Sequence, residues 1–137
     1  MRRRDQRRAA IFALYQQELT DRSLDEVFPP DARPFTRALA HATEDHREEL
    51  DALIERHAEG WTLDRIAPLE RNIMRVALLE LLHPDLVADP EPIPPEAAID
   101  EAVQTAKTFC GAEAPGFVNG ILAAALRAVR DNGARHA

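Results

Sequence analysis

The sequence predicts an all-α protein built as a single domain, 1–137. Apolar residues recur at intervals of three and four along nearly every long segment, which is the period of an amphipathic helix. No stretch alternates apolar and polar residues as a half-buried strand does, and no internal repeat of about 20–50 residues is found. A chain of 137 residues is long enough for one domain with a sizeable core.

The first half of the chain contains two predicted long helices. One runs from about Arg4 to Leu19 and is followed by a loop rich in proline. The second spans roughly 35–58, and Gly60 suits the end of this helix because glycine accepts the left-handed conformation common there. These elements form an expected N-terminal helical group, about 4–59.

The second half of the chain forms an expected C-terminal helical group, about 61–131. Pro68 and Pro95 each suit the first position of a helix, where the missing N–H has no cost. Five prolines make 84–95 a stiff connector without a folded element. The predicted elements are, in order, a helical turn at 62–66, a very apolar helix at 68–83, the connector at 84–95, a helix at 95–109, a loop at 111–116 and a helix at about 116–131.

Composition excludes several classes of protein. No run of about 18 apolar residues could span a membrane, and the chain has no charged-then-apolar secretory leader. The single cysteine, Cys110, excludes a disulfide framework and favours a cytoplasmic setting. Phosphate-binding glycine loops and a serine nucleophile motif are lacking, and His41, His46 and His57 are expected on a solvated face. We therefore expect no enzyme, no metal and no cofactor.

The charge of the chain is unevenly distributed. Residues 1–8 contain five arginines and one aspartate, a charge of +4, so the other 129 residues carry −11 of the net −7. Arg4, Arg8, Ile11 and Tyr15 follow one another at helical spacing, so the apolar stripe of the first helix continues backwards as arginine. Guanidinium groups there could bind phosphates and stack on bases. The alternative is a frayed, solvated tail.

Two other features invite a choice between structure and function. Glu80 lies on the apolar side of the most hydrophobic helix, so it either pairs with an arginine (Arg71, Arg75 or one on another helix) or faces a partner protein. Phe117, Asn119 and Gly120 open the last helix. We expect Gly120 to allow close helix packing, whereas Phe117 could be exposed for stacking. Phe109, at the end of the preceding helix, is expected to point inward.

Four segments resemble the NusB family. They are RRAAIFALYQQ at 7–17, LERNIMRVALLELL at 69–82, AIDEAVQTAKTF at 98–109 and FVNGIL at 117–122. The second is similar to the family's ERNxLRxAxYEL, and the last two to its AINEAVELAKxF and FVNGVL. They occur in the family's order and at matching spacing, which makes the combination specific.

The resemblance implies a NusB-like fold of two small three-helix bundles, with about six to seven helices. It implies a non-enzymatic, bacterial, cytoplasmic antitermination factor that binds boxA RNA of ribosomal-operon transcripts with ribosomal protein S10 (NusE), in the antitermination complex of RNA polymerase. Carried over by position, Glu80 would face the protein partner. The residues that would contact RNA are Arg2, Arg3, Arg4, Arg7, Arg8, Tyr15, Phe117 and Asn119.

The chain departs from the family pattern at several positions. Asp5 interrupts the arginine run, Asp100 and Leu79 replace the usual asparagine and tyrosine, and Gly116 stands where a cation is common. Fewer cations weaken phosphate binding, so we expect RNA binding to depend on NusE. Two alternatives remain: a homodimeric interaction module, and a detached relative of the RNA-binding domain of rRNA cytosine methyltransferases. The second would need a methyl-donor domain for which 137 residues leave no room.

Overall fold

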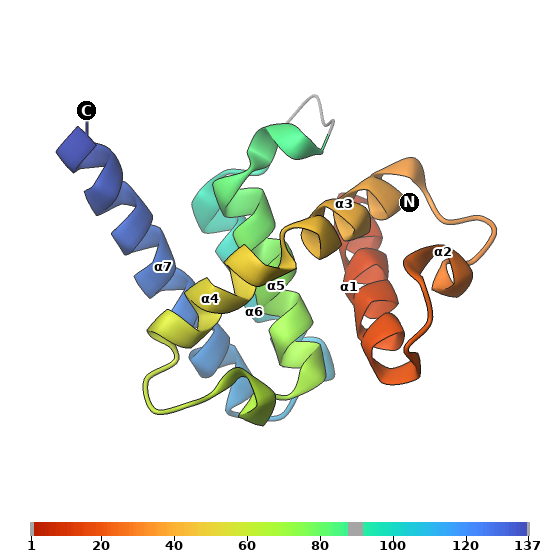
Figure 1. Ribbon diagram of the computed structural model, residues 1–137, viewed down its shortest axis with the longest axis horizontal. Coiled ribbons are helices and arrows are strands. Elements are labelled where there is room, and N and C mark those ends of the chain that lie inside the picture. Colours follow the sequence, from red (N-terminus) through yellow and green to blue (C-terminus); the bar gives the residue numbers. More distant parts are fainter. Residues whose placement is uncertain (1, 88–91, 137) are drawn as a thin grey trace.

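Helix α5 (Pro68–Leu82) occupies the middle of the computed structural model, which describes residues 2–87 and 92–136, with side chains described as far as 133 (Figure 1). It contacts α1, α3, α4, α6 and α7. Every residue from Asn72 to Leu79 is buried. A helix that is apolar on most of its circumference has to be surrounded by others, and this one is.

The prediction of an all-α protein is confirmed. In the described ranges the chain forms seven α-helices and two short 3₁₀ turns, with no strand. None of these helices is long and apolar enough to cross a membrane. The elements are α1 (Arg3–Thr20), α2 (Leu24–Val27), α3 (Pro34–Asp45), α4 (Arg47–His57), η1 (Leu63–Arg65), α5 (Pro68–Leu82), η2 (Pro84–Leu86), α6 (Pro95–Phe109) and α7 (Ala114–His136).

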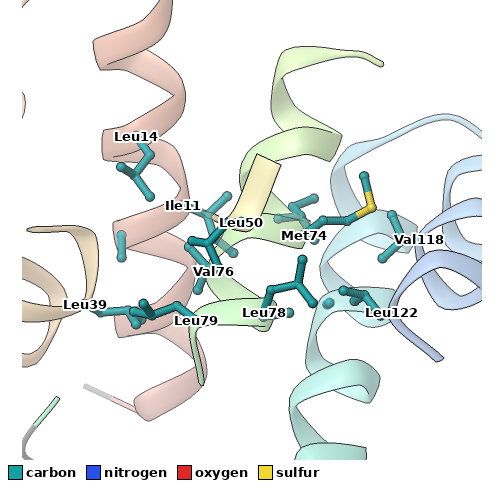
Figure 2. Close-up of a cluster of buried hydrophobic side chains, with 14 of the residues drawn as sticks. Ile11, Leu14, Leu39, Leu50, Met74, Val76, Leu78, Leu79, Val118 and Leu122 are labelled. Carbon is teal, nitrogen blue, oxygen red and sulfur yellow. The ribbon is translucent and has the colours of Figure 1, made fainter. Parts of the chain in front are cut away.

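A continuous core runs through α5. On one side Leu79 lies beside Leu39 of α3, and on the other Met74 and Leu78 point toward α7, where Leu122 is fully buried (Figure 2). Burial of side chains this large stabilises the fold by roughly 1.5–3 kcal/mol each. Because one helix supplies both sides, the helices before and after Gly60 share a single cluster of buried residues.

The single long helix expected over 35–58 is wrong, because α3 ends at Asp45 and α4 begins at Arg47. No proline or glycine marks this break. The hydroxyl of Thr43 donates to the carbonyl of Leu39, and the Nδ1 atom of His46 bonds the carbonyl of Ala42. Side chains that bond back to the preceding turn compete with the helical ladder and bend it. His46 leaves the helical conformation, with φ −106° and ψ 16°.

Three boundaries in the second half also differ from expectation. The connector 84–95 was expected to lack folded elements, but its first residues form η2, in which Pro84 occupies the first turn. The expected loop at 111–116 is shorter, because α7 begins at Ala114 and takes Pro115 into its first turn, where proline is well tolerated. Helix α7 continues to His136, past the expected end near 131.

Candidate nucleic-acid interface

The arginines at the start of α1 do not share one environment. Arg2 is the exposed residue before the helix. The guanidinium of Arg3 lies over the ring of Phe35, with its Cζ atom 4.1 Å from the ring centroid, and donates to Gln6 at 2.9 Å. This stacking fixes the direction of an exposed cation without burying its charge.

Arg4 forms a two-pronged ion pair with Glu101 of α6. Its Nε and Nη2 atoms each lie 3.1 Å from a carboxylate oxygen, and the side chain of Arg4 is 47% exposed. The hydrogen bond to Glu101 and the negative charge of that residue raise the pKa of Arg4 above its ordinary value. Exposed pairs of this kind contribute little to stability, so a phosphate group can replace the carboxylate.

Arg7 is held inside the molecule by Glu80 of α5. The Nε atom of Arg7 lies 2.9 and 3.0 Å from the two carboxylate oxygens, and both side chains are 11% exposed. Of the two readings given for Glu80, the structure shows pairing with an arginine on another helix. A role of Glu80 in partner binding stays a prediction, and it concerns a carboxylate whose exposed surface is small.

An aromatic pair adjoins Arg8 on the side of α1 that faces α6. The rings of Phe12 and Phe109 meet edge to face with centroids 4.9 Å apart, and the Cζ atom of Arg8 lies 5.4 Å from the centroid of Phe109. Phe109 was expected to point inward, but it is 44% exposed. The reason is its position at the last residue of α6, beyond the helices that cover the core. Tyr15, two turns after Arg8, is half-buried.

The two other sequence-predicted residues lie at the start of α7. Phe117 is half-buried and its ring meets that of Trp61 edge to face, with centroids 5.9 Å apart, while Asn119 is exposed. Sequence reasoning missed Trp61, which is the single tryptophan of the chain and is 50% exposed. Its position directly after Gly60 was the available signal. The predicted RNA-binding residues therefore belong to two clusters, one along α1 and one at α7.

A second arginine cluster, at the other end of α1, was not foreseen as such. Arg75 of α5 is 3% exposed and donates to Asp51 of α4 at 2.6 and 3.0 Å and to Glu18 of α1 at 3.2 Å. Arg71 adds an ion pair with Glu18 at 3.1 Å. Burial raises the pKa of Glu18, but the hydrogen bonds and charges of these two arginines outweigh it and hold that pKa below its ordinary value. This cluster fastens three helices together.

The other polar candidates do not form a metal site in the part of the chain described. No group of three or more histidine, cysteine, aspartate or glutamate side chains there could hold a metal ion. Cys110 is free and half-buried, and burial together with the charge of Glu70 raises the pKa of its thiol. The expectation of a solvated face is wrong for His57, whose Nε2 atom is buried.

Comparison with known proteins agrees with the fold and the motifs. The NusB family model matches residues 4–127. The chain is 37% identical over 136 residues to the transcription antitermination protein NusB of Halalkalibacterium halodurans, covering 95% of this chain and 97% of that protein.

Two solved structures are similar over nearly the whole chain. NusB of T. maritima superposes with a TM-score of 0.79 at 32% identity, covering 93% of this chain and 92% of that one. The NusB chain in a crystal structure of the antitermination factors NusB and NusE in complex with dsRNA has a TM-score of 0.76 at 27% identity, covering 92% and 96%. By sequence, by motif order and by fold, this chain belongs to the NusB family.

Proposed function

We propose that this chain is a non-enzymatic transcription antitermination factor of the bacterial cytoplasm. Together with ribosomal protein S10 (NusE) it binds the boxA element of ribosomal-operon RNA, so that RNA polymerase resists termination. Its relatives over almost the full length are antitermination proteins, and a structural neighbour was crystallised with NusE and RNA.

The observation that carries the proposal is the exposed surface along α1, where cations and an aromatic ring alternate. Arg4 is 47% exposed, and Arg8 lies beside Phe109, which is 44% exposed. Arginine forks bind phosphates, and exposed rings stack on unpaired bases, which is the combination that single-stranded RNA requires. A solvated tail would not order its arginines against Phe35, Glu101 and Phe109.

The predicted contacts are divided by their environments. Arg2, Arg3, Arg4 and Arg8 position the RNA through its phosphates, while Tyr15, Phe117 and Asn119 contact bases. Arg7 supports the RNA-binding surface indirectly, because its ion pair with Glu80 connects the RNA-facing helix α1 to α5. We propose that NusE docks near the exposed edge of Glu80, so that this ion pair lies between the two binding surfaces.

The test is to co-purify the chain with NusE and to measure binding of boxA and scrambled RNA at two salt concentrations. The double variant Arg4→Ala/Arg8→Ala should bind boxA more weakly and lower the slope of log K against log salt by about 2, roughly one unit for each lost phosphate contact. Arg22→Ala is a matched control, because Arg22 is an exposed arginine whose ion pair with Glu26 lies far along the chain from both sites.

Equal affinity for boxA and scrambled RNA would reduce the proposal to nonspecific attraction by a basic segment. An unchanged salt slope in the double variant would remove the arginines of α1 from the interface. Sedimentation of the chain with and without NusE completes the test, because self-association without NusE binding would favour the homodimeric module.

A further inference from the structure

A hollow lies between the end of α4 with the loop that follows it and the first four turns of α7. Its volume is about 400 Å³, and a second hollow of about 250 Å³ adjoins it on the other side of the Trp61–Phe117 pair. The six lining residues of the first hollow that matter here are His57, Trp61, Gly116, Phe117, Gly120 and Arg127. Trp61 comes from the loop after α4, whereas Phe117 and Arg127 both come from α7, which is far from that loop in sequence.

The loop holds Trp61 in a defined position although half of its surface is exposed. Gly60 has a φ of +76°, which only glycine adopts without strain, and the N–H of Trp61 donates to the carbonyl of Ala58 at 2.9 Å. Two residues later, the N–H of Leu63 donates to the carboxylate of Glu55 at 3.0 Å. The loop is therefore bonded back to α4 on both sides of Trp61, which lowers the entropy lost on binding.

Two glycines of α7 leave part of that side of the hollow without side chains. Gly120 was expected to allow close helix packing, and this expectation is wrong: a Cβ atom at Gly120 or at Gly116 would meet no atom within 4 Å. The two glycines are four residues apart, so they lie on one face of α7. A helix that has no side chains there lets a flat group approach its backbone beside Phe117.

One of the residues that line the hollow carries a polar atom without a hydrogen-bond partner. The Nε2 atom of His57 is buried and makes no hydrogen bond to any described residue. Burial, with the charges of Arg56 and Arg127, lowers the pKa of His57, so its ring is neutral near pH 7. A neutral imidazole can form a hydrogen bond with the edge of a base, while the Arg127 guanidinium at the rim can bind a phosphate.

We propose that this hollow binds one unpaired nucleobase, which stacks on the face of Trp61, lies beside Phe117 and bonds to His57. The inference rests on the proposed function and extends it, because it adds Trp61, His57, Gly120 and Arg127 to the RNA-binding surface. The aromatic pair, the bare face of α7, the cation at the rim and the unpaired ring nitrogen together favour a base over an apolar side chain of a protein.

The single tryptophan gives a direct readout of this site. The chain, in complex with NusE, is titrated with boxA RNA while tryptophan emission is followed, and the Trp61→Phe complex is subtracted as background. Stacking of a base on Trp61 should quench its emission at the RNA concentration where the anisotropy of labelled RNA reports binding. When the nucleotides of boxA are replaced one at a time by an abasic ribose, the quench should be lost at one position, which identifies the base that stacks on Trp61.

The second part of the experiment fills the hollow with a side chain of the protein. Gly120→Leu places a side chain where no atom lies within 4 Å, so the helix can form while the base is excluded. We expect RNA affinity to fall about tenfold, within the range measured for loss of one base–aromatic stack. Gly133→Leu is the matched control, since Gly133 lies in the same helix with equally open surroundings.

Each outcome separates this inference from the proposed function. If RNA binds by anisotropy but Trp61 emission does not change, or if Gly120→Leu binds as tightly as Gly133→Leu, the base site is wrong and the proposed function stands. If NusE alone changes Trp61 emission and RNA adds nothing, the hollow is a protein contact, which also overturns the inference. If no RNA binds, both proposals fail.

Discussion

The two ends of α1 use the same ion-pair chemistry for different purposes. At its first turns, Arg4 meets Glu101 at the surface, with the arginine side chain 47% exposed. At its last turns, Glu18 receives Arg75, whose side chain is 3% exposed. An exposed pair can exchange its carboxylate for a phosphate at little cost, whereas a buried pair cannot be opened without leaving charges unsolvated. Exposure therefore decides which arginines can serve RNA.

The largest effect should come from Arg75. Arg75→Met removes the buried arginine that Glu18 and Asp51 share, and the other arginine that pairs with both, Arg47, is exposed. Loss of one member of a buried ion pair costs about 3–5 kcal/mol. Urea unfolding measures the loss as a lower transition midpoint. The matched control is Arg130→Met, because Arg130 pairs with Glu96 at the surface and its removal should leave the midpoint unchanged. Equal effects of both substitutions would erase the distinction between buried and exposed pairs.

Arg7 should behave as an intermediate case. Arg7→Met removes the ion pair between Arg7 and the largely buried Glu80, and loss of such a charge-assisted hydrogen bond costs about 2 kcal/mol. A double-mutant cycle with Glu80→Gln, followed by urea unfolding, measures the coupling directly. We expect the sum of the two single effects to exceed the effect of the double variant. Additive effects would mean that the pair contributes nothing and that Arg7 is free to contact RNA.

The sequence was sufficient to predict the helices whose apolar residues recur at regular helical spacing. The period of apolar residues and the helix-initiating prolines placed α6 at Pro95–Phe109, as the structure has it. The break at His46 could not be predicted in this way, because it is marked by the side chains of Thr43 and His46 bonding back to the previous turn, which apolar spacing does not record. The sequence has no proline or glycine at this position that would mark the end of a helix.

The candidate site was predictable only in its composition. The spacing of Arg4 and Arg8 predicted that both lie on one side of α1. It did not predict which groups of α6 they contact, the carboxylate of Glu101 and the ring of Phe109. Trp61 was missed because its contact with Phe117 joins residues 56 positions apart, and a lone aromatic after a glycine has no periodic signal. Contacts between distant segments depend on helix packing, which spacing within one helix does not contain.

Acidification should weaken the buried cluster through Glu18. Its folded pKa is lowered, so the stabilisation is fully present at neutral pH and above the unfolded pKa of about 4.3. Below that value the unfolded chain takes up the proton first, and stability falls as the pH approaches the folded pKa. Thermal unfolding from neutral pH down to pH 3 should therefore show a steeper decline for the natural chain than for Glu18→Gln. Parallel curves would contradict this role of Glu18.

The smallest effect on stability is expected where RNA is proposed to bind. Glu101→Gln removes the charge that holds Arg4, and because this pair is exposed, the unfolding midpoint should not change measurably. RNA affinity should rise, since Arg4 is released toward phosphate and a negative charge near the RNA backbone is lost. Asp100→Asn is the matched control, because it removes an exposed acidic charge from the neighbouring position of α6. If both variants raise affinity equally, only net charge matters. A larger gain from Glu101→Gln, measured by anisotropy at two salt concentrations, would show that the carboxylate competes with RNA for Arg4.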